Sequence, residues 1–166
     1  MTSTQSLVGI GEIQAVQGEA TFICIGLGSC IGLYVFDSIA DVSAMAHFML
    51  PKAFDKTTSD RPAKFADTGF IALIEIVERL GGDRKRLRAI IAGGAHVLQS
   101  RTINSQLEFG VRNTRTVKEM LTEYGIEVIA EDTGGSKGRT LTVNGASGKV
   151  TIRTAAEPER TLCRIK

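Results

Sequence analysis

The sequence predicts an α/β fold, a sandwich of mixed, largely antiparallel β-sheet with flanking helices. Short apolar segments rich in β-branched residues predict strands, and two longer segments have helical periodicity. Most connections between the predicted strands are too short for helical crossovers, which favours antiparallel pairing. The chain has 166 residues, of which 43% are hydrophobic, so it can build one domain with a sizeable core.

The first third of the chain predicts strands. They cover residues 8–16, 20–25, 31–36 and 42–50, with Pro51 after the last. Residues 37–41 form a hairpin connection between the third and fourth of these strands. Residues 20–36 carry no charge. This stretch is shorter than the roughly 20 residues of a membrane-spanning helix, and glycines interrupt it, so we interpret it as two buried strands joined by a turn.

Two helices are predicted further along the chain. The first carries apolar residues at helical spacing, Asp67 or Thr68 as a cap and glycines at its end; its stripe is Phe70, Leu73, Ile74, Val77 and Leu80. The second covers residues 111–124 and ends at Gly125; its stripe is Val117, Met120, Leu121 and Tyr124. A short buried strand, 89–92, lies between the two helices.

Three further strands complete the predicted fold, at residues 126–130, 140–143 and 149–153. Residues 134–138 are a glycine-rich flexible connection. We expect one domain over residues 1–166, with flexible tails at 1–6 and about 155–166.

The charge is unevenly distributed. Residues 1–51 hold four acids and no base, a net charge of −4, and the rest hold 20 bases and 14 acids, or +6, which gives +2 overall. This small excess does not indicate nucleic-acid binding, and the start of the chain lacks the basic residues of a secretory signal. Three cysteines, an odd number, do not predict a disulfide framework, so we expect a reducing, cytoplasmic location and no membrane insertion.

The candidate catalytic residues are Cys30 and His47. Cys30 ends a glycine-rich turn, Gly26-Leu27-Gly28-Ser29-Cys30, and His47 lies on a predicted strand. A thiol becomes a strong nucleophile when a neighbouring imidazole takes its proton. The backbone N–H groups of Ser29 and Cys30 are candidates for stabilising an oxyanion. The competing interpretation is that Cys30, like Cys24, is simply a small residue of the core; Cys163 lies in a charged tail and is interpreted as an incidental thiol.

The hairpin brings these two residues together. Pairing about residue 39 places His47 opposite Ile31, next to Cys30. No metal site is predicted, because the two histidines have no clustered carboxylate. No cofactor is predicted either, since the glycines fit neither a dinucleotide fingerprint nor a P-loop.

Several motifs together resemble the CheD family of chemoreceptor glutamine deamidases. They are residues 26–30, Ala46-His47-Phe48-Met49-Leu50-Pro51, Lys64-Phe65-Ala66-Asp67-Thr68, Ile91-Ala92-Gly93-Gly94-Ala95, Gly110-Val111-Arg112-Asn113, and Glu131-Asp132-Thr133-Gly134-Gly135 with Gly138-Arg139. The resemblance covers roughly residues 7–153, in order along the chain.

The resemblance implies an α/β sandwich related to deamidating bacterial toxins. It implies hydrolysis of glutamine side-chain amides on the cytoplasmic domains of chemoreceptors, with Cys30 as nucleophile and His47 as general base. It also implies a CheC-type phosphatase as a regulatory partner. Segments 110–113 and 134–139 are expected to frame the site.

One position departs from the family pattern. Close relatives carry a threonine six residues before the nucleophile, where this chain has Cys24. A thiol is a weaker hydrogen-bond partner than a hydroxyl, so Cys24 is only a possible third member of the site. Two alternatives to an enzyme remain: a non-catalytic module that binds a CheC-type phosphatase, and a thiol redox protein that uses Cys24 and Cys30.

Overall fold

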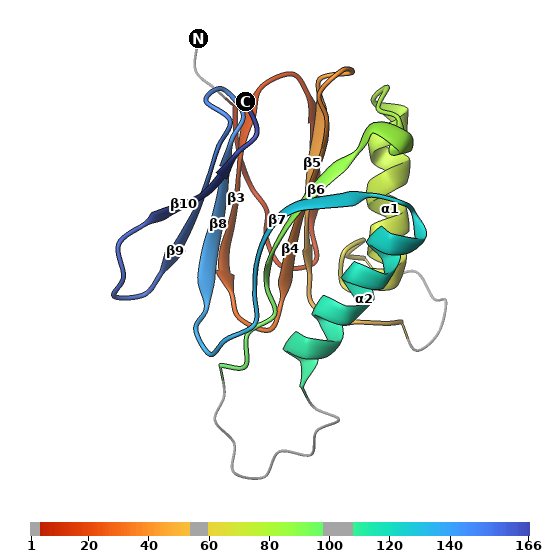
Figure 1. Ribbon diagram of the computed structural model, residues 1–166. Helices are drawn as coiled ribbons and strands as arrows, with labels where there is room; N and C mark the ends of the chain where they lie inside the picture. The colour runs from red at the N-terminus through yellow and green to blue at the C-terminus, as the bar shows by residue number, and fades with distance from the viewer. Residues whose placement is uncertain (1–3, 54–59, 98–107) are drawn as a thin grey trace.

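The computed structural model describes residues 4–53, 60–97 and 108–166. It has three layers: an outer sheet, an inner sheet and a pair of helices (Figure 1). Each sheet has five strands. The predicted α/β sandwich with mixed sheets is confirmed.

The outer sheet has the strand order β1-β3-β8-β9-β10. Its strands are β1 (Thr4–Leu7), β3 (Ala20–Leu27), β8 (Arg139–Asn144), β9 (Lys149–Thr154) and β10 (Arg160–Arg164). Only the pair β1 and β3 is parallel; the other pairs are antiparallel. Alternation in β3 and β8 turns Phe22, Leu141 and Val143 toward the inner sheet.

The inner sheet has the order β2-β5-β4-β6-β7. Its strands are β2 (Ile13–Gln17), β5 (Val42–Phe48), β4 (Ile31–Asp37), β6 (Arg88–Gly93) and β7 (Glu127–Thr133). Every residue of the central strand β4 is buried, because the outer sheet covers one face and the helices cover the other. The uncharged stretch 20–36 therefore contains two buried strands, as predicted.

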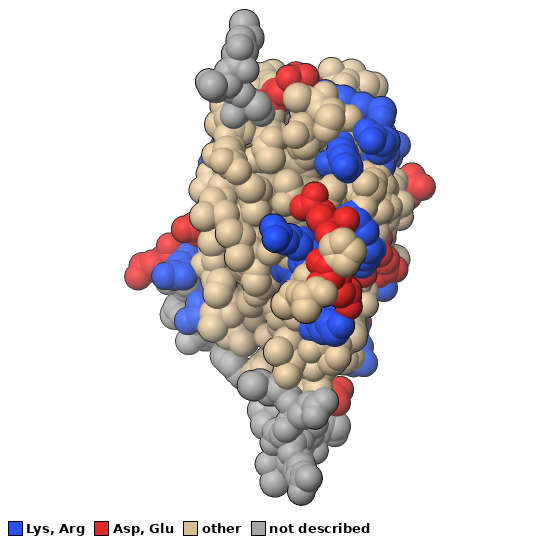
Figure 2. Space-filling view, turned by 90° about the vertical axis from the view of Figure 1, so that its left-hand side faces the viewer, with Lys and Arg blue, Asp and Glu red and all other residues tan. Residues whose placement is uncertain are grey.

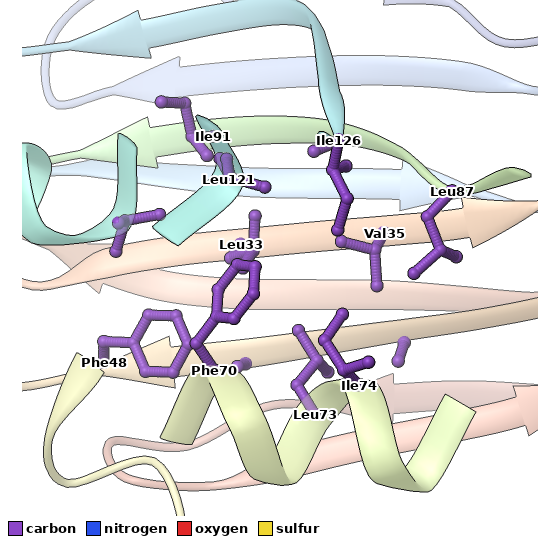
Figure 3. Packing of buried hydrophobic residues seen from close by; sticks show 14 of the residues in the cluster. Leu33, Val35, Phe48, Phe70, Leu73, Ile74, Leu87, Ile91, Leu121 and Ile126 are labelled. Atoms are coloured by element: carbon purple, nitrogen blue, oxygen red, sulfur yellow. The ribbon is translucent and has the colours of Figure 1, made fainter. Parts of the chain in front are cut away.

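Helices α1 (Ala66–Arg79) and α2 (Phe109–Glu123) cover the free face of the inner sheet, and a short 3₁₀ helix, η1 (Arg84–Arg86), precedes β6. Figure 3 shows Phe70, Leu73 and Ile74 of α1 packed against this sheet. Leu121 of α2 packs into the same cluster. Both predicted helical stripes are thus confirmed as core-facing.

The outward face of the outer sheet is seen in Figure 2. Charged side chains gather toward one side of this view, and most of the remaining face is uncharged. Half-buried Thr21, Ile23, Thr140 and Thr142 contribute to this face, since alternate residues of β3 and β8 point inward. Within the described residues, no helix is long and apolar enough to cross a membrane.

The structure corrects some of the sequence-based predictions. Residues 160–164, expected in a flexible tail, form β10 because they pair with β9 and bury part of Leu162 and Cys163. The predicted strand 8–16 is interrupted by a turn that includes Gly11, whose φ is +79°. Helix α1 begins after Phe65 and has no side-chain cap, so neither Asp67 nor Thr68 caps it.

The expectation that helical crossovers are absent is also wrong in one place. Strands β6 and β7 are parallel, and α2 lies in the connection between them. Parallel neighbours require such a crossover. This connection brings the N-terminal end of α2 beside the end of β6, at the position of the candidate site.

Candidate active site

The candidate site lies where several segments meet at one end of the molecule. Figure 1 shows the end of β3, the start of β4, the end of β6 and the N-terminal end of α2 together at this end. Cys30 lies in the turn between β3 and β4, and His47 is the penultimate residue of β5. Strands β4 and β5 are antiparallel neighbours, with Gly32 opposite His47.

Cys30 and His47 point toward the same space, the layer between the two sheets. On β5, Ala46 and Phe48 face the helices, so His47 points the other way, as does Met45. Cys30 packs against the cluster between the sheets. Cys30 directly precedes Ile31, the first paired residue of β4, so its backbone lies near the position diagonal to His47 across the strand pair.

The register differs by one residue from the predicted register. His47 is opposite Gly32 and not Ile31, because the hairpin pairs Asp37 with Val42 across the four residues 38–41. A slip of one residue moves a side chain to the other face of a sheet. The predicted register would have put His47 on the face of Ile31, toward the helices. The observed one puts it on the face of Cys30.

His47 is held in one tautomer by the backbone. Its Nδ1 lies 3.0 Å from the carbonyl oxygen of Val8, which can only accept a hydrogen bond, so Nδ1 carries the proton. Nε2 is therefore the unprotonated nitrogen; it is buried and has no hydrogen-bond partner among the described residues. Burial lowers the pKa of His47, although the Val8 carbonyl and the charge of Glu12 act in the opposite direction. His47 is thus a neutral imidazole with a free lone pair, as a general base requires.

Cys30 is partly exposed, whereas Cys24 is fully buried. Burial raises the pKa of the Cys30 thiol, and the backbone N–H of Cys30 partly offsets this rise. Burial, with a contribution from Cys30, raises the pKa of Cys24 to about 12. The resting site therefore pairs a neutral, accessible thiol with a neutral imidazole, and Cys24 stays protonated in the core.

Cys24 lies next to Gly32, the residue opposite His47 on β4. A Cβ atom built on Gly32 would be 3.4 Å from the Cys24 sulfur and 3.0 Å from Cδ1 of Leu27. A third catalytic member would orient His47 through a hydrogen bond. In this structure the carbonyl oxygen of Val8 accepts that hydrogen bond from His47. Every residue type has a backbone carbonyl, so the sequence could not indicate this contact.

The turn that carries Cys30 is fixed through its carbonyl groups. The carbonyls of Gly28 and Cys30 accept hydrogen bonds from the N–H groups of Ala95 (2.8 Å) and Gly94 (2.9 Å). The Ser29 carbonyl accepts one from Nδ2 of Asn113 at 2.9 Å. In a trans peptide the N–H points opposite to the carbonyl. The N–H groups of Ser29 and Cys30 therefore point away from Ala95 and Asn113, and that of Cys30 lies close to its own sulfur, where an oxyanion would form.

The remaining candidate residues lie around or away from this pair. His96 lines a pocket of about 300 Å³ beside Ser29, together with Gly28 and Phe109. Cys163 is on β10 and packs against the cluster between the sheets. A larger groove of about 700 Å³ lies between α2 and β7, lined by Val111, Lys118 and Thr133 among others; no cysteine or histidine lines it.

The expected framing segments are tied to the site by hydrogen bonds. Buried Arg139 donates to the carbonyls of Asp132 and Gly134. The N–H of Gly134 donates to Gly93, and that of His96 donates to Gly135. Asn113 connects the other segment, 110–113, directly to Ser29. No group of three His, Cys, Asp or Glu side chains in the described parts of the chain could hold a metal ion.

Comparison with known proteins identifies the family. The family model described as "CheD chemotactic sensory transduction" matches residues 49–154. The chain belongs to the CheD family. A relative from Desulforamulus reducens, named "Probable chemoreceptor glutamine deamidase CheD", is 41% identical over 151 residues, or 91% of each chain. A relative from Thermotoga maritima, named "Chemoreceptor glutamine deamidase CheD", is 38% identical over 156 residues, or 94% of this chain and 96% of its own.

The match to a relative, and not the match to the family model, includes the candidate site. The family model begins at residue 49, beyond both candidate catalytic residues. At most 15 of the 166 residues lie outside the 151-residue match to the Desulforamulus relative, so that match includes Cys30 and His47. Membership of the CheD family, indicated by the motifs of the sequence, is confirmed.

Proposed function

We propose that this protein hydrolyses glutamine side-chain amides of chemoreceptors to glutamate and ammonia, as a protein-glutamine glutaminase in chemotaxis. The observation that carries this proposal is the state of His47: Nδ1 donates to Val8, and the bare Nε2 is buried on the face of the sheet toward which Cys30 points. The printed names of the CheD relatives support the same substrate and reaction.

The reaction begins with proton transfer from Cys30 to Nε2 of His47, which requires a rotamer change that brings sulfur and nitrogen together. The thiolate attacks the carbon of the substrate carboxamide, and the N–H groups of Ser29 and Cys30 stabilise the oxyanion. The C–N bond breaks, and the imidazolium gives its proton to the departing ammonia. A water molecule, deprotonated by His47, then hydrolyses the thioester and regenerates the thiol.

Because the proposed substrates are the cytoplasmic domains of chemoreceptors, we propose that the protein acts in the cytoplasm. The proposed reaction uses neither a cofactor nor a nucleic acid. The resemblance to the family adds a CheC-type phosphatase as regulatory partner.

One domain carries the whole site, because Cys30, His47 and Asn113 come from three segments of the same sandwich. Cys24 serves as a core residue and not as a necessary third member.

The test is deamidation of a purified receptor cytoplasmic fragment, followed by ammonia release and by mass spectrometry of glutamine-containing peptides. Wild type should convert selected glutamines, and Cys30→Ala and His47→Ala should abolish conversion. Cys163→Ala, on the far strand β10, is the matched control and should retain full activity. Cys24→Ala should stay within about threefold of wild type, since it removes no orienting hydrogen bond from His47.

Conversion that survives Cys30→Ala would refute the proposed chemistry. Binding of a CheC-type phosphatase without any ammonia release would instead assign the chain as a non-catalytic binding module. A loss of more than about a hundredfold in folded Cys24→Ala would restore Cys24 as a catalytic member.

A further inference from the structure

One buried amide bridges the two segments that carry the candidate catalytic residues. Asn113 lies near the start of α2, and its side chain is completely buried. Its Nδ2 donates to the carbonyl oxygen of Ser29 at 2.9 Å and to that of Met49 at 3.0 Å. Ser29 immediately precedes Cys30, and Met49 lies two residues after His47.

The bridge begins where the β-ladder ends. The pairing of β4 with β5 stops at Ile31 opposite Phe48, so the next pair, Cys30 opposite Met49, lies beyond the ladder. At this point the strands are joined through the Asn113 amide. A single NH₂ group with two donors binds both carbonyls and so fixes how far apart the two chain ends lie.

Few side chains can donate hydrogen bonds to two carbonyl groups at once in this position. Asp offers no donor in its charged form, a hydroxyl offers only one, and Gln is longer by a methylene. A buried amide is costly unless its hydrogen bonds are made, and Asn is a poor helix former. Oδ1 of Asn113 is buried without a partner among the described residues, so the two donated bonds are what compensates for burying this side chain.

The helix that carries Asn113 is seated tightly on the site. A Cβ atom on Gly110 would lie 2.6 Å from the carbonyl oxygens of Gly94 and Ala95, and one on Gly94 would lie 2.1 Å from Oγ1 of Thr114. These glycines allow helix and loop to approach each other without side chains between them. The position of Asn113 is therefore rigid relative to the turn of Cys30.

We infer that Asn113 is a positioning residue for the deamidation: it fixes the spacing between Cys30 and His47 and aims the N–H group of Cys30. The role rests on the proposed function, because it acts through that pair. Misplacing reacting groups by about 1 Å can cost roughly 10²-fold in rate. Loss of the bridge should therefore lower kcat about a hundredfold and leave KM within about threefold, since Asn113 is buried away from substrate.

The experiment compares Asn113→Ala with Thr116→Ala, a buried polar residue one turn further along α2. For each variant, kcat and KM are measured on deamidation of a receptor fragment. Asn113→Ala should lower kcat about a hundredfold and leave KM within about threefold, whereas Thr116→Ala should leave both near wild type. Asn113→Ser, which keeps one donor, should give an intermediate kcat.

A readout on the wild type does not depend on any variant folding. The side-chain NH₂ protons of Asn113 should be protected from hydrogen exchange, because both are bonded and buried. Rapid exchange, or folded Asn113→Ala with wild-type kcat while Cys30→Ala is inactive, would overturn the role of Asn113 and leave the proposed function intact. Activity in Cys30→Ala would instead overturn the proposed function itself.

Discussion

At the scale of single residues, the decisive property of the site is that both partners are neutral. Burial raises the pKa of Cys30 above its ordinary 9.0 and lowers the pKa of His47 below its ordinary 6.5. A pre-formed thiolate–imidazolium pair would need the reverse order. The proton must therefore move during the reaction and not before it.

This order of pKa values predicts two pH profiles. Peptide-resolved alkylation of Cys30 by iodoacetamide should be slow at neutral pH and rise about tenfold per pH unit until above pH 9.0, because only the thiolate reacts. The kcat/KM for deamidation should fall on the acid side only below pH 6.5, where His47 becomes protonated and cannot accept a proton. Fast, pH-independent alkylation at pH 6 would show that the ion pair exists at rest.

At the scale of elements, the end of β6 shapes the turn that carries Cys30. Gly93 has a φ of +112°, and a Cβ atom there would lie 2.1 Å from the carbonyl oxygen of Cys30. That oxygen belongs to the backbone of the site and is also bonded by Gly94. A side chain at position 93 must therefore displace either β6 or Cys30.

We expect Gly93→Ala to lower the free energy of unfolding by about 3 kcal/mol or more and to abolish deamidation, through backbone strain and the clash together. Gly125→Ala is the matched control: it has a φ of +67° and no atom within 4 Å of the added Cβ. The control should lose only the strain of its backbone, about 1–2 kcal/mol, and stay active. Urea unfolding measures both variants, and equal losses would contradict the clash.

The elements themselves were largely predictable from the sequence, but their relation within the site was not. Apolar periodicity located both helices and most strands, because burial on one face or both leaves a pattern. The register of β4 and β5 was missed by one residue, since it depends on the local turn: Asp37 accepts hydrogen bonds from Ile39 and Ala40, and Asp41 has a φ of +54°. The contacts of Val8 and Asn113 with the site depend on backbone atoms far apart in sequence, which no residue pattern records.

At the scale of the whole molecule, an ion pair between buried Asp37 and partly exposed Arg86 stabilises the end of the inner sheet that is remote from the site. The carboxylate of Asp37 is fully buried and accepts hydrogen bonds from Nε and Nη2 of Arg86. It also accepts one from the N–H of Asp83. The guanidinium of Arg86 holds the pKa of Asp37 well below its usual range.

Asp37→Asn should lower the free energy of unfolding at pH 7 by roughly 2–3 kcal/mol, because it leaves buried donors without a charged partner. The folded-state pKa lies below the unfolded value of 3.8, so this stabilisation is complete above about pH 4 and declines as the pH falls further. The difference between wild type and variant should therefore shrink between pH 4 and pH 2 in urea titrations. Glu78→Gln, which breaks the partly exposed pair with Arg84, is the control and should cost less.

The main chain of Val8 sets the tautomer of His47. Val8 is held in place by its own N–H, which donates to Ile23 of β3. Replacing the Val8 side chain leaves the carbonyl oxygen where it is, so alanine scanning would score this position as a packing residue and overlook its hydrogen bond to His47.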